Sequence, residues 1–233
     1  LPSIVKSIDK NYGVKLGPYG GYSLRHGWPA KAIYTYNHHP RYIVNQMGLR
    51  NKIGILSEAF AHDRFYKRMN GTYGFVAEIL EFTNKNSKKI IEINAKATQD
   101  AITNVIENAG KVEKGVRFKM VPLEEKFTLR TYDYTSYKND AGETKYLRSG
   151  KIIELPEVEN YSKFEPKVSS TLPRGYFLPK SLKSIVEHLK NQGVEVTELK
   201  KSKRAVGDLF MVNTLKHSQR KFEGHNMATL EGD

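Results

Sequence analysis

A carboxylate, two guanidinium groups, a phenol and an amide lie close together in the first quarter of this sequence. They belong to Glu58, Arg41, Arg50, Tyr36 and Asn45. A positioned carboxylate is suited to acid–base chemistry, because it can take up and return a proton. The planar forks of arginine are suited to binding the carboxylate of a substrate. The segment therefore carries groups for proton transfer and for substrate binding.

An apolar run directly before Glu58 predicts the element that positions it. Residues 52–57 contain three aliphatic side chains interrupted only by one glycine. This pattern is typical of a strand that is buried on both faces, as in parallel sheets. Ligands of open α/β sheets bind beyond the carboxyl ends of the strands. We therefore expect Glu58 at such a strand end, beside a neighbouring strand over residues 32–36.

The side chains around Glu58 also have structural explanations. Arg41 and Arg50 could brace the loop around the carboxylate, and this explanation has the same weight as substrate binding. Tyr36 could line the pocket or be half-buried on an alternating strand. Asn45 could order the turn that follows it. These alternatives stay open at the level of sequence.

The segment is similar to the catalytic-glutamate region of a known enzyme family. This chain has T-Y-N-H-H-P-R-Y over residues 35–42, then Asn45, G-L-R-N-K-I over 48–53 and L-S-E-A over 56–59. It resembles the T-Y-D-H-R-P-R-F…N…G-L-R-N-R-I…L-S-E-A segment of bacterial zinc carboxypeptidases, the carboxypeptidase A–like metallopeptidases. The resemblance implies a peptide substrate. It also implies that Glu58 is the general base, which activates a zinc-bound water against a peptide carbonyl.

The zinc ligands of that family are missing from this sequence. The family binds zinc through an H-x-x-E pair and a later histidine in an Asp-x-His setting, and neither pattern accompanies any of the seven histidines here. The adjacent His38 and His39 would point to opposite faces of a strand, which disfavours their sharing one metal. We therefore expect zinc and its ligands in an upstream region of a full-length parent, and no zinc on this chain alone. The competing hypothesis is a catalytically inactive, peptidase-derived module that binds peptides or cell-wall material.

Composition limits the other classes of function. With 39% hydrophobic and 27% charged residues, the 233-residue chain fits a folded globular protein. No apolar run approaches the roughly 18 residues that span a bilayer, and the absence of cysteine excludes disulfides and thiolate metal sites. A net charge of +13 is compatible with nucleic-acid binding. No motif of a nucleic-acid-binding fold accompanies it, so we favour scattered surface lysines. The resemblance implies a periplasmic or secreted location.

Hydrophobic periodicity predicts an α/β catalytic portion over residues 1–110. The Gly- and Tyr-rich residues 11–30 are typical of loops, without the spacing of a phosphate-binding loop. Apolar residues recur at spacings of three or four from Phe75 to Val105, which predicts a long helix. We expect this helix to cover a partial parallel or mixed sheet. Residues 1–110 would then be the C-terminal part of a carboxypeptidase-like domain.

Residues 111–233 predict a β-rich α+β accessory region. Strand alternation occurs over 116–121 and 127–132, with a hairpin turn at 139–142. The acidic, proline-containing residues 154–166 are expected to form a loop. Further expected elements are a β-α-β unit near 173–201, with strands at 175–178 and 194–199, and a final strand pair at 208–215 and 221–230.

Overall fold

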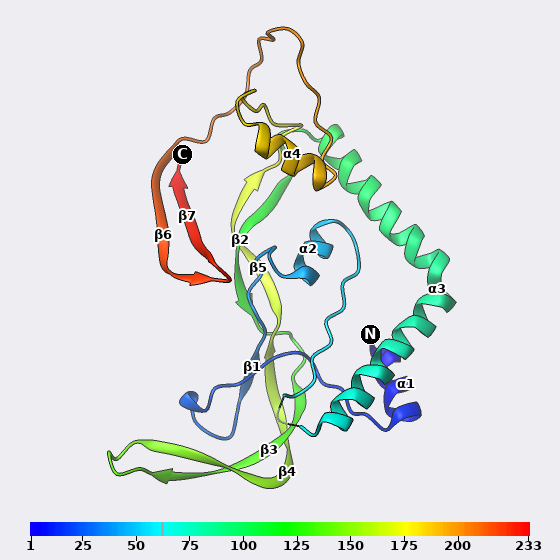
Figure 1. Ribbon diagram of the computed structural model, residues 1–233, viewed down its shortest axis with the longest axis vertical. Coiled ribbons are helices and arrows are strands. Elements are labelled where there is room, and N and C mark those ends of the chain that lie inside the picture. Colours follow the sequence, from blue (N-terminus) through cyan, green and yellow to red (C-terminus); the bar gives the residue numbers. More distant parts are fainter. Residues whose placement is uncertain (62) are drawn as a thin grey trace. The chain divides into compact units, whose positions relative to one another are not determined.

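The computed structural model describes residues 1–61 and 63–233, and these form two compact units (Figure 1). The first unit is Leu1–Tyr176 and the second is Phe177–Asp233. The boundary expected after residue 110 lies inside the first unit, because strands from both sides of it pair in one sheet.

A mixed three-stranded sheet organises the first unit. Strand β1 (Ala32–Tyr34) pairs in parallel with β4 (Thr144–Tyr161), and β4 pairs antiparallel with β3 (Phe127–Lys138). The β3–β4 hairpin turns at Asn139, whose side-chain oxygen accepts a hydrogen bond of 2.8 Å from the Glu143 N–H. The expected turn is therefore confirmed. Together with the helices, this partly parallel sheet confirms the α/β fold class.

A second pair of strands forms an antiparallel ribbon in the same unit. It consists of β2 (Glu113–Val121) and β5 (Lys163–Thr171). The predicted strand over 116–121 is therefore confirmed and begins three residues earlier.

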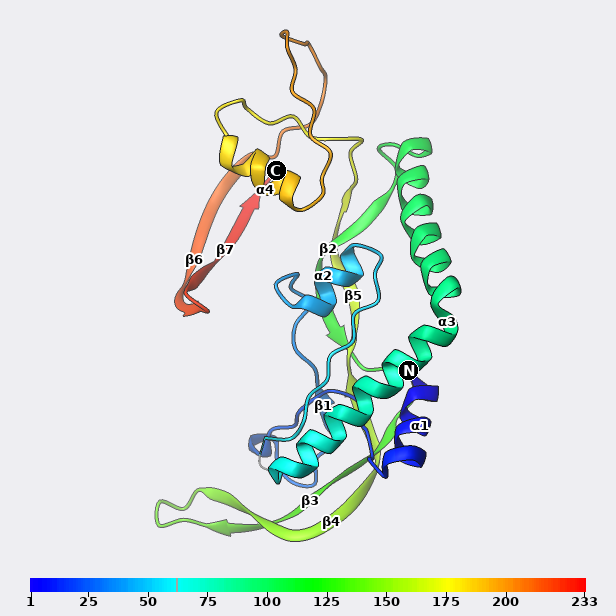
Figure 2. The ribbon, with the colours of Figure 1, turned by 45° about the vertical axis from the view of Figure 1, so that its right-hand side comes forward.

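Two helices build the main apolar cluster of the first unit. Helix α1 (Pro2–Tyr12) packs against the N-terminal half of α3 (Phe65–Glu107), as Figure 2 shows. Ile4 and Ile8 of α1 are buried against Phe75 of α3. The Tyr12 ring lies so close to Gly74 that a Cβ added there would stand 2.8 Å from it. The predicted long helix is therefore confirmed, and it begins earlier than its apolar stripe.

The loop expected over residues 154–166 was wrong, because these residues belong to β4 and β5. Strand β3 pairs Leu129 with Leu155 and Phe127 with Val158, so Pro156 and Glu157 lie opposite the single residue Thr128, which is a bulge of one extra residue. A bulge accommodates a proline, which has no N–H for the strand ladder. Pro166 of β5 lies in a ribbon of only two strands. Each strand of such a ribbon has one edge without a neighbour, and a residue that faces this edge needs no N–H donor. Proline therefore marks irregularities within these strands and does not end them.

The second unit contains one helix and one hairpin. Helix α4 (Lys183–Asn191) is the only regular element that the described residues form within 173–201, so the two expected flanking strands were wrong. Strands β6 (Val212–Phe222) and β7 (His225–Gly232) confirm a final strand pair, but its turn lies at 223–224 and not within the expected 216–220. Their two-residue turn has positive φ at both positions, 48° at Glu223 and 83° at Gly224, as tight hairpins require. Among the described residues of both units, no helix is long and apolar enough to cross a membrane.

Candidate functional site

Tyr36 lies in a cluster of three tyrosines. Its half-buried ring is 5.5 Å from that of Tyr19 and 4.6 Å from that of Tyr42, between ring centroids. Burial raises the pKa of Tyr36, and the neighbouring Tyr19 and Tyr42 raise it further. The phenol therefore keeps its proton well above neutral pH and can donate a hydrogen bond.

The two adjacent histidines lie on one side of the chain. Their rings stack with centroids 5.0 Å apart, and the His38 ring is 5.1 Å from Phe118 of β2 and 5.6 Å from Phe164 of β5. The expectation of opposite faces was wrong, because residues 37–39 do not form a strand. Burial lowers the pKa of His39, and the nearby His38 and Arg41 lower it further. The neutral imidazole of His39 is therefore favoured.

Asn45 holds the histidine loop in place from the short helix α2 (Ile43–Leu49). Its side-chain N–H groups donate to the backbone carbonyls of Asn37 and His39, each at 3.1 Å. This geometry supports the explanation in which Asn45 orders the local backbone. Its role in substrate binding stays a prediction.

The two arginines flank helix α2 and are exposed. Arg41 precedes the helix and is close enough to His39 to affect its pKa. Arg50 is the C-cap residue of α2, where its backbone N–H bonds to the Met47 carbonyl at 3.0 Å. The structure therefore places both guanidinium groups on the surface of one small helical segment.

The buried strand expected over residues 52–57 was wrong. These residues form an extended, irregular segment in which Ile53 is 62% and Leu56 37% exposed. The backbone of residues 53–59 makes no hydrogen bond to another described residue. Gly54 lies close to α2, since a Cβ there would lie 3.0 Å from the Val44 Cα.

The physical reason is the absence of strand partners. A strand buried on both faces needs neighbours along its edges and cover above and below. The expected neighbour, β1, instead pairs with β4 on one edge and bridges Gly21 on the other. Glu58 is therefore an exposed carboxylate on an irregular segment. It does not take part in the ring contacts of Tyr36 or in the hydrogen bonds of Asn45.

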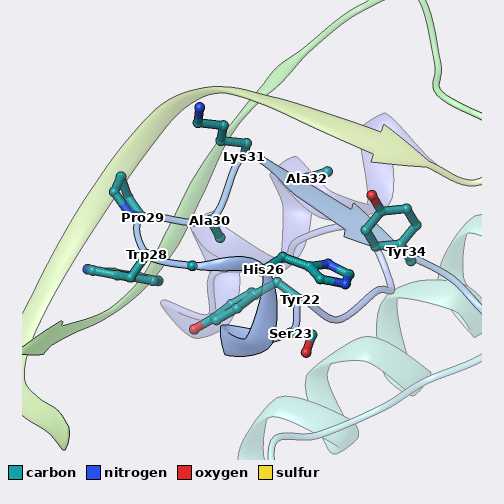
Figure 3. Close-up of a pocket in the computed structure, with 10 residues that line it drawn as sticks. Tyr22, Ser23, His26, Trp28, Pro29, Ala30, Lys31, Ala32 and Tyr34 are labelled. Carbon is teal, nitrogen blue, oxygen red and sulfur yellow. The ribbon is translucent and has the colours of Figure 1, made fainter. Parts of the chain in front are cut away.

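A pocket lies between Tyr22 and Tyr34, and most of its residues belong to a stretch for which the sequence predicted only a loop. It has a volume of about 510 Å³ and is shown in Figure 3. The Tyr22 hydroxyl is 2.7 Å from that of Thr131, and the Trp28 indole N–H donates to Asp133 at 3.1 Å. The signal that was available in the sequence is the density of aromatic residues among the glycines of this stretch.

Aromatic contacts fix the walls of this pocket. Trp28 lies 4.8 Å from Tyr134 of β3 in an edge-to-face arrangement, and Tyr34 stacks on Tyr161 of β4 at 4.7 Å. Burial raises the pKa of Tyr22 to about 12, with Tyr134 adding to the rise and the Thr131 hydrogen bond opposing it. The Tyr22 phenol is therefore neutral at physiological pH.

The described residues do not assemble the donor set of a zinc site. Within residues 1–61 and 63–233, no three or more His, Cys, Asp or Glu side chains are grouped so as to hold a metal ion. The described residues therefore do not fit the zinc that the family resemblance implies, and the chemistry below is restricted to the chain's own groups.

Searches among family models, curated proteins and solved structures found no match to this chain.

Proposed function

We propose that the chain is the C-terminal portion of a bacterial metallocarboxypeptidase that hydrolyses C-terminal peptide bonds. The observation that carries the proposal is the run of matching residues from Thr35 to Ala59, with Glu58 at the position of the general base. A periplasmic or secreted location and a peptide substrate belong to the same proposal. Zinc and its ligands would come from polypeptide outside this chain.

Each residue of the site has a role that its environment allows. Glu58 takes a proton from the attacking water and passes it to the leaving amine. Tyr36 keeps its proton and donates a hydrogen bond to the substrate. The exposed guanidinium groups of Arg41 and Arg50 attract the substrate carboxylate. Asn45 holds the loop between Asn37 and His39 in position.

The large exposed surface supports the involvement of further polypeptide. The chain exposes 19,029 Å², whereas a compact protein of 26.6 kDa exposes about 10,700 Å². Two separate compact bodies of the sizes of the two units would still expose only about 12,500 Å². The difference between the observed and the expected exposed area is several times the area of about 1,600 Å² that a standard protein–protein interface buries. Additional polypeptide that covers Ile53 and Leu56 would also supply the edges that residues 52–57 lack.

The test is a pair of matched substitutions in the product of the complete reading frame. Glu58→Gln removes the proposed base, and Glu124→Gln removes another exposed carboxylate, which follows β2. Release of C-terminal amino acids from peptides should fall about 10²- to 10⁴-fold for Glu58→Gln and stay unchanged for Glu124→Gln. Zinc content, measured in parallel, should be the same in both variants. Full turnover in Glu58→Gln would contradict the assignment.

The second candidate is the inactive binding module, which the missing H-x-x-E pair favours. It predicts a complete gene product that holds no zinc and releases no amino acid, yet binds peptides equally well with and without Glu58→Gln. The zinc content of the unmodified protein therefore distinguishes the two candidates before any substitution is made.

A further inference from the structure

The pocket between Tyr22 and Tyr34 is large enough to hold a small ligand. Its volume of about 510 Å³ lies within the range of roughly 300–1,000 Å³ that is typical of small-molecule sites. The rings of Tyr22, Trp28 and Tyr34 line it, and Ser23 and His26 lie among them (Figure 3). It therefore combines aromatic walls with a few polar groups.

The aromatic walls offer ring faces, and the polar groups of two of the three rings are already engaged. The hydroxyl of Tyr22 and the indole N–H of Trp28 are both engaged by side chains of β3. Trp28 is supported by Tyr134, and Tyr34 by Tyr161 of β4. Because these contacts fix the rings before a ligand arrives, little side-chain freedom is lost on binding.

The polar groups favour a neutral ligand. Lys31 contributes to the lining, but its side chain leads away from the rings in Figure 3, so no ammonium faces the pocket. An anion would therefore lack a facing cation. A ligand cation would find no carboxylate among the lining residues, although aromatic faces alone would attract it. The hydroxyl of Ser23 and the imidazole of His26 remain as hydrogen-bonding groups for a neutral guest.

From this combination we propose that the pocket binds a neutral pyranose sugar, as a monosaccharide or a disaccharide. The apolar C–H face of a sugar ring packs on Tyr34, and its hydroxyls bond to Ser23 and His26, which lie on the same side of the pocket as Tyr34 in Figure 3. Glu58 is not among the residues that line this pocket, and the proposal does not depend on the proposed peptidase activity. A sugar site of this kind would direct the protein to glycan-bearing material.

The chain itself supplies the reporter for the test, because Trp28 is its single tryptophan. Cellobiose, maltose and diacetylchitobiose are titrated to millimolar concentration while Trp28 emission is followed, and heats of binding are measured in parallel. At least one of these sugars should cause a saturable change by both methods. Adenosine monophosphate and choline serve as anionic and cationic probes. Absence of saturable sugar binding, or binding of a charged probe alone, would overturn the proposal.

Substitutions locate the binding and separate ring contact from hydroxyl contact. Tyr34→Ala should weaken sugar binding at least about tenfold, because a stacked wall is lost, while Tyr34→Phe keeps the ring and should bind as the unmodified chain does. Tyr137→Ala, at a position on β3 that is 54% exposed and outside the pocket, is the matched control. Unchanged binding in Tyr34→Ala would also refute the site.

A second variant covers the case in which Tyr34→Ala fails to fold. Ala32→Leu enlarges a small residue of β1 that lines the pocket, and removes no packing contact. It should abolish sugar binding by filling the space, with an unchanged circular dichroism spectrum. Glu58→Gln should leave sugar binding intact, so failure of the sugar site and failure of the peptidase assignment give different results.

Discussion

The contact between α1 and α3 provides a sharp test of how this chain is held together. Ile8 is fully buried and packs with Ile4 and Phe75. Ile8→Ala removes three carbon atoms, worth about 0.8 kcal/mol each in transfer free energy. It also leaves a cavity, because the facing side chains are fixed on two helices. The free energy of unfolding should therefore fall by about 2–5 kcal/mol.

The matched control is the same substitution on the surface of the longer helix. Ile91 of α3 is 67% exposed, so Ile91→Ala should change the free energy of unfolding by no more than about 0.5 kcal/mol. Alanine also has the higher helix propensity, which would offset part of any loss. Urea unfolding of both variants, followed by circular dichroism, measures the difference. Equal stability of the two variants would show that α1 is not docked on α3, and the packing argument would be refuted.

Three further predictions concern the loops. The pKa of Tyr22 is raised from 10.0 to about 12, so the folded state holds the phenol proton more tightly than the unfolded state does. The free energy of unfolding should therefore fall as the pH rises from 10 to 12, and it should fall less in Tyr22→Phe. Asn45→Ala removes two hydrogen bonds to the loop carbonyls, so the unfolding free energy should drop by about 1–3 kcal/mol and the His39 amide should exchange faster with solvent. Gly54→Ala forces a Cβ to 3.0 Å from Val44, so proteolysis within residues 53–59 should accelerate as that segment leaves α2; an unchanged cleavage rate would contradict the close approach.

The elements that could be predicted from sequence are those whose signal is local. The long α3 follows from a 3.6-residue period that runs through Phe75 to Val105. The β3 alternation and the turn at Asn139 likewise need only neighbouring residues. In contrast, the strands over 154–166 depend on a bulge that takes Pro156 out of the ladder, and proline alone gives no sign of such a bulge.

The candidate site shows the same division. The chemical groups of Tyr36, Arg41, Asn45, Arg50 and Glu58 could be selected by residue type and by resemblance, whereas their surroundings could not. The tyrosine cluster around Tyr36 and the carbonyls that Asn45 binds come from loop geometry. The strand before Glu58 failed as a prediction because a two-sided strand is a property of its neighbours as much as of its own residues.

The free backbone of residues 53–59 also determines how this chain behaves when it is concentrated. An extended segment with exposed Ile53, Ile55 and Leu56, whose amides bond to no other described residue, is a template onto which an identical segment of another molecule can add. Self-association should therefore increase with protein concentration. A lysine in place of Ile55 would suppress it, because a charge at this position disfavours edge-to-edge pairing. The segment that carries the proposed base is thus also a site at which the chain can aggregate.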